Sequence, residues 1–561
     1  MGDQRPEEGL ANEAGRLRLT RRELLTRAAA LGLSTSVLAA LGTACGSEGG
    51  EKPAAQATSG SSVPKPTAAS SQVAPQVAKS PGKEKALRVR IGADMQTADP
   101  AHIGQSADHA VAFLVHRGLV KYKAGSLDVV PDLATDWKIS DGGKVYTFNL
   151  RKGVKWHKGF GELTAEDVVY SIGRIKDPAT KSRFQADVDV IDKVEAPDKY
   201  VVRFTLKNPF SPFLGAILAF RPGWILNKKA VEERGDQFGM NPVGCGPYVF
   251  DTWSRGTEVV LKRNPDFYEP LDIDKVSFKV IKEETVAELA LRSGDLDLSY
   301  IYEGESAERL MNDKPADLES KSLPGYRTQW TSFNITRPAV KDVRVRKAII
   351  HAINKKAAAE AVYKSLGQPV SSIFNPNIPG WINPDPFPYD PAKAKQLLAD
   401  AGYANGLDVK MIVQPNVGWP ELATVLQDQW RVVGIRAELV IRERAVYDEM
   451  SQKGQDWDID GHNISRADAF QYAAFLYGPN IPFPNNHHYK GADDIIEAAI
   501  AESDDAKRLE LWKKFQEKAL IEDVAGFGMT NVKYVLAWHK GIKGVDAQYQ
   551  DSYPIDKMTM E

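Results

Sequence analysis

The segment VVPDLATDWKISDGGKVYTFNLRKGVKWHKGFGELTAEDVVYSI (Val129–Ile172) contains a turn, a strand and the start of a helix. Apolar and polar residues alternate over Tyr146–Leu150, which is the pattern of a half-buried strand. The turn residues Asp141–Gly143 come just before this strand. Thr164, followed three residues later by Asp167, is the typical start of a helix. This segment is therefore predicted to be mostly β-structure with one helix.

On either side of this segment the pattern changes from β-rich to alternating α and β. Further strands are predicted at Leu87–Ile91 and Val202–Leu206, and the β-rich region extends over 129–207. In the second half, one helix is predicted from Asp342 to about Tyr363. Another is predicted to start at Asp390-Pro391 and to end at Gly402.

The region after Gly402 predicts a parallel βαβ unit. A strand near Leu407–Gln414 is followed by a helix from Pro420 and a strand at Ile435–Ile441. Such a unit is right-handed in nearly all proteins. The fold class is therefore α/β with a β-rich insertion.

Composition excludes several functional classes. The chain has 561 residues, with 72 Lys+Arg against 74 Asp+Glu and a net charge of −2. This balance argues against a nucleic-acid-binding protein, and 43% hydrophobic residues argue against a disordered chain. Only one sustained apolar run exists, so a protein with many membrane spans is excluded as well. The length allows three or four domains.

The first 85 residues are predicted to direct export rather than to fold. Arg21 and Arg22 precede an uncharged run, Ala28–Ala44, so residues 1–44 are interpreted as an export signal. The paired arginines favour the twin-arginine route, and the alternative is an ordinary Sec signal. Cys45 follows Leu-Gly-Thr-Ala, which resembles a lipidation site; the alternative is plain cleavage after Ala44. Residues 45–85 are then a lipid anchor with a disordered linker.

Motifs for catalysis, cofactors and metals are absent from the sequence. There is no HExxH, GxSxG, Walker loop or GxGxxG, so no cofactor is expected. His102, His109 and His116 are seven residues apart, but ordinary core or surface histidines are the favoured interpretation over a metal site. Cys245 is expected to be an inert buried thiol. The pair Glu283-Glu284 is expected to lie on a solvated helix face.

Several stretches together resemble the bacterial extracellular solute-binding proteins of family 5, the oligopeptide, dipeptide and nickel-type receptors of ABC importers. Val129–Ile172 resembles the family signature. The other matching stretches follow in the family's order: Thr97–Ala101 (TADPA), Pro242–Phe250 (PVGCGPYVF), Leu261–Tyr268 (LKRNPDFY), Leu291–Leu298 (LRSGDLDL), Ser332–Ile349 (SFN…VRVRKAI) and Tyr389–Tyr403 (YDPAKAKQLLADAGY). Cys245 departs from the Thr or Asn that is usual there. The resemblance covers the chain from about Leu87 to the C-terminus.

The resemblance implies two lobes around a ligand cleft, together with an extra β-rich domain. Mapped onto this chain, lobe I comprises 86–131, 241–328 and 528–561, the β-rich inserted domain is 132–240, and lobe II is 329–527. Crossovers near Thr328–Asn334 and Val524–Thr530 would form the hinge. The second crossover contains Gly526 and Gly528, which suit a segment that changes its backbone angles.

The resemblance also implies a ligand site. In the peptide-binding members, an Asp of lobe II pairs with the α-ammonium of the ligand, and the backbone beside it bonds the peptide as an added strand. The segment WDIDGHNISRADAF (Trp457–Phe470) occupies this place, and Asp468 matches that Asp. The alternative role of Asp468 is a helix N-cap. The other expected ligand-binding residues are Asn463, Ser465, Arg466, Phe333 and Asn334.

The function expected from this resemblance is capture of a peptide by lobe closure and delivery to an ABC import permease. The expected protein is a monomer tethered to the membrane through Cys45, with no nucleic-acid partner. An oligosaccharide or a metal chelate is the alternative ligand. A secreted hydrolase is a third possibility, although the sequence offers no nucleophile–base pair for it.

Overall fold

The computed structural model describes residues 84–313, 315–415, 418–454, 456–477, 489–546 and 552–561. Residues 79–561 form one compact unit. The expected export signal, the paired arginines and Cys45 lie outside the described residues. Within the described ranges, no helix is both long and apolar enough to span a bilayer.

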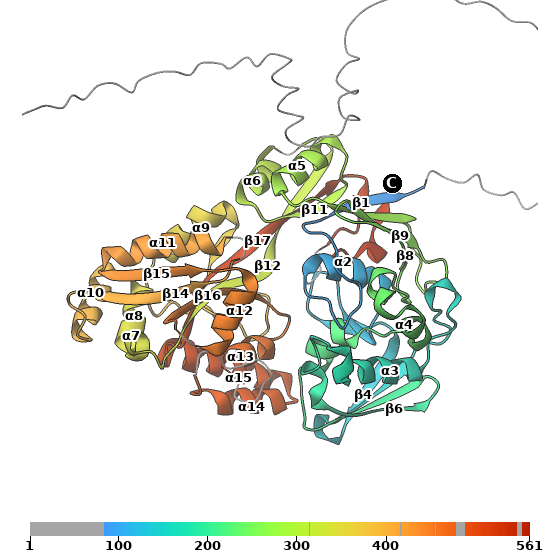
Figure 1. Cartoon of the computed structure of the whole chain (residues 1–561), viewed down its shortest axis with the longest axis horizontal. Helices are drawn as coiled ribbons and strands as arrows, with labels where there is room; N and C mark the ends of the chain where they lie inside the picture. Colours follow the sequence, from blue (N-terminus) through green and yellow to red (C-terminus); the bar gives the residue numbers. More distant parts are fainter. Residues whose placement is uncertain (1–83, 314, 416–417, 455, 478–488, 547–551) are drawn as a thin grey trace, which may run out of the picture. The chain divides into compact units, whose positions relative to one another are not determined.

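The largest sheet takes strands from most of the length of the chain. Its two longest strands, β12 (Leu318–Phe333) and β17 (Gly526–His539), lie side by side in its middle and connect its two halves (Figure 1). These strands pair with each other antiparallel from Leu318 to Ser332. The strand order is β15-β14-β16-β12-β17-β11-β1-β10-β9-β8, and β13 (Gly367–Pro369) pairs with β17 from the side.

Beyond β17 the strands are β11 (Leu298–Ile301), β1 (Ala86–Ile91), β10 (Lys275–Val280), β9 (Glu258–Arg263) and β8 (Tyr248–Ser254). Beyond β12 they are β16 (Ile459–Ser465), β14 (Leu407–Val413) and β15 (Ile435–Ile441).

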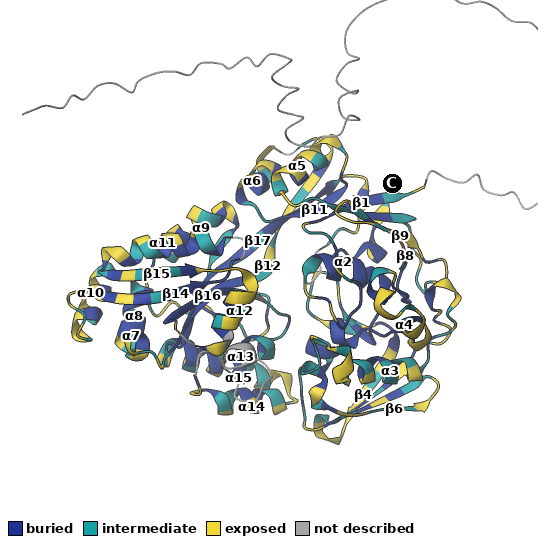
Figure 2. Cartoon of the chain, viewed as in Figure 1, coloured by how far each residue is buried: buried dark blue, intermediate teal, exposed yellow. Residues whose placement is uncertain are grey.

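The predicted βαβ unit is confirmed. Strands β14 and β15 pair in parallel, with Leu407 opposite Ile435, and α11 (Trp419–Val432) connects them. Leu422, Leu426 and Trp430 form the buried face of α11, whereas its opposite face is exposed (Figure 2). This amphipathic spacing fixes the helix against the sheet.

The helix predicted from Asp342 to Tyr363 is wrong in one respect, because it is two helices. These are α8 (Val343–His351) and α9 (Lys355–Tyr363). The break occurs at Asn354, whose side chain accepts a hydrogen bond from Ala357 N at 3.0 Å. An asparagine that bonds to its own backbone starts a new helix instead of continuing the old one. The remaining helices of this half are α7 (Pro338–Lys341), α10 (Pro391–Asp400), α12 (Arg444–Lys453), α13 (Ala469–Tyr477), α14 (Asp493–Ala501) and α15 (Asp505–Gln516).

A second, smaller sheet contains the segment quoted at the outset. Its order is β4-β5-β7-β6, all antiparallel, and α3 (Ala165–Lys176) packs on it. Thr164 and Asp167 form the predicted capping box at the start of α3. The strands are β4 (Ala134–Ser140), β5 (Val145–Leu150), β6 (Ile191–Asp198) and β7 (Val201–Leu206).

Gly528 is required in β17 by close packing rather than by its backbone angles. It is not among the glycines with a positive φ. A Cβ built on Gly528 would lie 2.1 Å from the carbonyl oxygen of Ser372, a backbone atom that cannot turn away. A glycine therefore lets the backbone of the segment after β13 approach β17 at this point.

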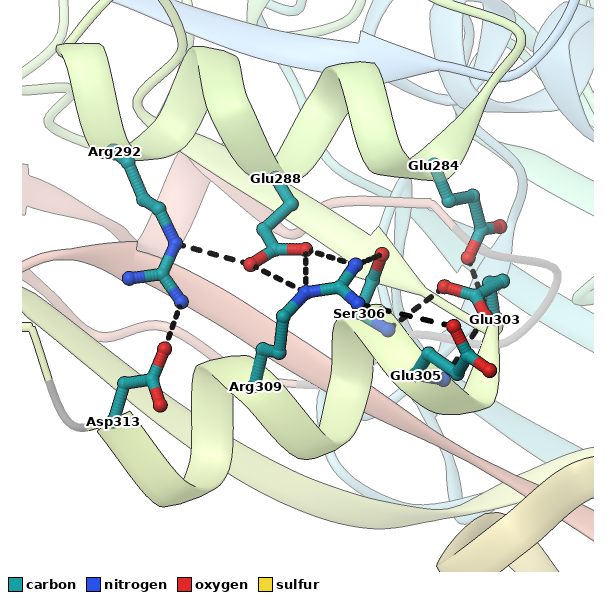
Figure 3. Close-up of polar contacts among 8 residues, drawn as sticks. All are labelled: Glu284, Glu288, Arg292, Glu303, Glu305, Ser306, Arg309 and Asp313. Atoms are coloured by element: carbon teal, nitrogen blue, oxygen red, sulfur yellow. Dashed lines mark hydrogen bonds and ion pairs between the residues drawn. The ribbon is translucent and has the colours of Figure 1, made fainter. Parts of the chain in front are cut away.

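Helices α5 (Glu284–Ser293) and α6 (Gly304–Asp313) are joined by a network of ion pairs (Figure 3). Glu288 is buried and accepts hydrogen bonds from Arg292 and Arg309. Glu284 accepts from the backbone N–H groups of Tyr302 and Glu303 and pairs with Arg90 at 3.3 Å. The expectation that Glu284 is simply solvated is therefore wrong, because it anchors the start of α6 to α5.

Arg117 lies at the centre of a buried charge cluster that fastens the C-terminal segment to the first half of the chain. Its Nη2 is 2.7 Å from Asp556 Oδ2, and its Nε is 3.8 Å from Asp132 Oδ2. Lys121 and the hydroxyl of Tyr268 contact the other oxygen of Asp132 at 3.2 and 2.6 Å. Arg117 and Asp132 are each only 2% exposed. The cluster thus joins segments more than 400 residues apart in the sequence.

Several buried histidines are held neutral. Burial lowers the pKa of both His116 and His157 to about 4, against hydrogen bonds to the carbonyls of Ala98 and Gly246 that raise it. Burial also lowers the pKa of His109, with help from the positive charge of Arg221. These side chains are thus core residues, as the sequence favoured.

We expect the protein to lose stability as the pH falls from about 6.5 to about 4. In this window the unfolded chain protonates His116 and His157, whereas the folded chain does not, so protons favour unfolding. Each histidine contributes a slope of at most about 1.4 kcal/mol per pH unit. Urea unfolding at pH 7.5 and 5.0 measures the change. In the variant His116→Gln/His157→Gln the slope should be smaller; an unchanged slope would contradict this assignment.

Candidate functional site

The segment that the sequence singles out as a ligand site begins on β16. Strand β16 pairs antiparallel with β12, so Asn463 lies opposite Gln329 and Ser465 lies opposite Arg327. The backbone N–H of Asn463 donates to the side chain of Gln414 at 3.0 Å. Asn463 and Ser465 are half-buried. This pairing fixes the course of the chain up to the residues that follow the strand.

Asp468 lies directly before α13 and caps it. Its Oδ1 accepts a hydrogen bond from Phe470 N at 2.8 Å, and its carbonyl accepts from Gln471 N. The side chain is half-buried, and burial raises the pKa of its carboxyl against the effect of the hydrogen bond from Phe470. No cation lies within ion-pair distance of Asp468 among the described residues, although the positive charge of Arg508 partly counteracts the rise in its pKa. The N-cap alternative is thus present in the geometry, and it uses one of the two carboxylate oxygens.

Arg466 lies between Ser465 and Asp468 and faces an acidic residue from a distant part of the chain. Its Nη1 donates to the carbonyl of Ser465 at 3.1 Å. Asp187, next to the small sheet, experiences the positive charge of Arg466, but burial raises its pKa to about 6. No local sequence pattern pairs these two positions.

Residues near the small sheet also contact the helices that follow the site. Phe210 packs edge-on against Phe470, with ring centroids 5.0 Å apart. Ser211 N donates to the carbonyl of Ile500 at 3.0 Å. Ala467 is buried in the same apolar cluster as the core of the small sheet. The predicted site therefore lies where two parts of the fold, far apart in the sequence, meet.

Comparison with known proteins identifies the family of this chain. A sequence profile of the bacterial extracellular solute-binding proteins, family 5, matches residues 128–482. The chain belongs to this family. The dipeptide-binding protein of Escherichia coli K12 is 30% identical over 440 residues, which cover 72% of this chain and 81% of that protein.

Solved structures of the family share the fold of this solute-binding protein. One is a periplasmic binding protein of Helicobacter pylori, DppA, in complex with the peptide STSA: 28% identity, TM-score 0.73, covering 85% of this chain and 98% of that one. Another is MoaA of Agrobacterium tumefaciens R10 in complex with mannopinic acid: 29% identity, TM-score 0.73, covering 85% and 100%. The predicted α/β fold of a periplasmic binding protein is confirmed.

Two of the expected ligand residues of this family 5 protein are packed inside it. Phe333 is fully buried and its ring lies 5.6 Å from that of Phe527. Asn334 is also fully buried; its side chain donates to the carbonyl of Gly454 at 2.8 Å and accepts from Thr336. Both side chains pack in the core at the end of β12. The other four expected residues, Asn463, Ser465, Arg466 and Asp468, lie at or just after the end of β16.

The remaining candidates for chemistry in this solute-binding protein are inert in the structure. Cys245 is 1% exposed, and burial raises the pKa of its thiol, so it is not a reactive nucleophile. Among the described residues, no group of three or more His, Cys, Asp or Glu side chains is arranged to hold a metal ion.

Proposed function

We propose that the protein is the receptor of an ABC importer, which captures a short peptide outside the cytoplasm and passes it to a permease. The observation that carries this proposal is the Asp468 carboxylate, half-buried beside the end of β16 with one oxygen left over from helix capping. An α-ammonium supplies the charge and the donors that such a carboxylate needs. The peptide complexes and peptide-binding names among its relatives support the same ligand class.

We further propose that Asn463, Ser465, Arg466 and Asp468 line the ligand. The main chain of this segment continues from a paired strand, so it can offer hydrogen bonds to a peptide in extended form. Main-chain bonding is indifferent to side chains, which suits a receptor for many sequences. The domain division given above and the monomeric state belong to this proposal, which assigns the protein binding and no catalysis.

Ligand binding should close the two halves that β12 and β17 connect. We expect small-angle scattering to give a smaller radius of gyration with a saturating library of random tripeptides than without it. The same library with acetylated N-termini serves as the control, because it lacks the ammonium for Asp468. If the free peptides stabilise and saturate the protein but its radius of gyration does not change, closure is contradicted. A protein that neither library stabilises would contradict the proposed ligand.

We also propose that Cys45 carries a lipid anchor and that Arg21 and Arg22 select the twin-arginine route. The variant Cys45→Ala should then move from the membrane fraction to the soluble fraction, as measured by immunoblot after cell fractionation. The variant Arg21→Lys/Arg22→Lys should accumulate in the cytoplasm. Wild-type protein that is already soluble would contradict the anchor, and export of the double lysine variant would indicate the Sec route.

A further inference from the structure

The β-rich inserted domain meets the helices that follow β16 at a junction to which the proposed function assigns no role. One side of the junction comes from the chain before β12, and the other comes from the chain between β12 and β17. The chain passes from one side to the other only through these two strands. If the strands bend as a hinge, the contacts in the junction can form and break while each side stays folded.

Apolar side chains from both sides are buried together in the junction. Phe210 is 7% exposed, and its ring meets that of Phe470 edge-on, with ring centroids 5.0 Å apart. Leu127, Phe470 and Ile500 each pack against two apolar clusters, the core of the small sheet and the core around α13, α14 and α15. Opening the junction therefore exposes apolar surface to water, which favours the closed arrangement.

Ser211 adds polar contacts to the same junction. Its backbone N–H donates to the carbonyl of Ile500 at 3.0 Å, and its hydroxyl donates to the carbonyl of Ala499 at 3.4 Å. Both carbonyls belong to the last turn of α14, where a helix has no partners of its own for its carbonyl groups. The inserted domain thus caps a helix of the other side.

Asp187 brings an acidic group to the junction. It lies in the short helical turn before β6 and faces Arg466; the other charged groups on that side are Asp468 and Arg508, whose charge also acts on Tyr146 of β5. Burial raises the pKa of the Asp187 carboxyl to about 6, against the effect of Arg466. Opening would return this pKa towards about 3.9, so the closed junction binds a proton more tightly and a fall in pH favours closing.

We propose that the inserted domain is a latch for the closed form: Phe210 and Ser211 dock on α13 and α14, and the latch tightens when Asp187 takes up a proton. The latch needs no contact with the ligand, so it raises the affinity for every ligand by the same factor. The inference rests on the proposed function in one respect, because its test uses a peptide to close the protein.

Hydrogen–deuterium exchange at Ser211 measures the latch. A fragment covering residues 209–213 has only the amide hydrogens of Phe210, Ser211 and Phe213, because Pro209 and Pro212 have none. The N–H of Ser211 bonds across the junction, whereas that of Phe213 bonds to the carbonyl of Phe210 within the inserted domain. Mass spectrometry with fragmentation of the peptide separates the two amides. Protection is the exchange rate of the unstructured sequence divided by the rate in the protein.

A fixed concentration of the random tripeptide library should raise the protection of Ser211 and leave that of Phe213 unchanged. If the library stabilises the protein against heat but does not protect Ser211, the latch is overturned and peptide binding stands. If the library neither stabilises the protein nor protects Ser211, the proposed function fails and this inference fails with it.

Variants on the other side of the junction keep the sequence of the measured fragment. At the same library concentration, Phe470→Ala should lower the protection of Ser211 about 10- to 100-fold. Ile500→Ala keeps the accepting carbonyl and lies away from Asp468, and it should lower the protection about 3- to 10-fold. Phe387→Ala is the matched control, because this half-buried ring packs on His351 instead, and it should behave as wild type.

The protection of Phe213 shows whether each variant is folded. Unchanged protection of Ser211 in Phe470→Ala and Ile500→Ala would overturn the latch. An equal loss at Ser211 and Phe213 in both variants would do so as well, because the junction would then be part of one folding unit.

The proton dependence is tested at pH 7.5 and pH 5.0 in wild type and in Asp187→Asn. Asp468 and the peptide termini titrate in both proteins, so the ratio of wild-type protection to variant protection isolates Asp187. With a pKa of about 6 in the closed form and about 3.9 in the open form, this ratio should rise about tenfold from pH 7.5 to pH 5.0. A ratio that does not change would overturn the role of Asp187.

Discussion

Replacing Asp468 with asparagine is expected to weaken the binding of a free tripeptide by about two to four orders of magnitude. The ammonium of the ligand would then be buried by closure without a counter-charge, which costs about 3–5 kcal/mol. Asparagine caps a helix as well as aspartate does, so the hydrogen bond from Phe470 should survive. Asp468→Asn thus removes the charge and keeps the cap. Calorimetric titration measures the loss.

The controls for this prediction separate the two roles of Asp468. Asp468→Ala should lose the same affinity and in addition about 1 kcal/mol of unfolding free energy, because the cap is lost too. Asp504 caps α15 in the same manner, through a 3.0 Å hydrogen bond from Lys507 N, and Asp504→Asn should bind as wild type does. Acetylating the peptide should reproduce the loss in wild type and add little in Asp468→Asn. If Asp468→Asn binds the peptide as tightly as the wild-type protein does, Asp468 acts only as a helix cap.

Replacing Arg117 with methionine is expected to lower the free energy of unfolding by about 3–5 kcal/mol. The side chain is 2% exposed, and its removal leaves Asp132 and Asp556 buried with too little positive charge nearby. The loss should appear in urea unfolding, and it should loosen the C-terminal segment that Asp556 fastens.

A surface ion pair provides the contrast. Arg436 and Asp408 are 2.7 Å apart but 56% and 77% exposed, so Arg436→Ala should cost no more than about 1 kcal/mol. The triple variant Arg117→Met/Asp132→Leu/Asp556→Leu should regain part of the lost stability, because apolar side chains bring no buried charge. A cost for Arg117→Met as small as that for Arg436→Ala would show that water reaches the cluster.

Sequence reasoning succeeded where the determinants are local. The capping box of Thr164 and Asp167 and the alternation in β5 depend on residues a few positions apart, and the structure contains both elements. The parallel pairing of β14 with β15 follows from the strand–helix–strand spacing. The break at Asn354 was missed because a helical period on both sides hides one competing side chain. The role of Glu284 was missed because its partners, Arg90 and the backbone of Tyr302, come from other segments.

The site could be predicted only in part, for the same physical reason. Asp468 is proposed because the segment around it resembles that of a known family. Asp187 and Phe210 come from segments more than 250 residues away, and no pattern within any one segment indicates that they meet the segment around Asp468. Phe333 and Asn334 were also expected at the ligand, but the structure buries both side chains completely. Position on a strand near a hinge does not determine which face a side chain occupies.

The central claim is that this receptor holds a short peptide by its α-ammonium, through the carboxylate of Asp468. Native mass spectrometry of the protein as purified, followed by release and fragmentation of whatever it retains, tests this most directly. The account predicts bound short peptides with free amino termini, absent from protein carrying Asp468→Asn. A retained neutral sugar, or peptides with blocked amino termini held equally well by that variant, would contradict it.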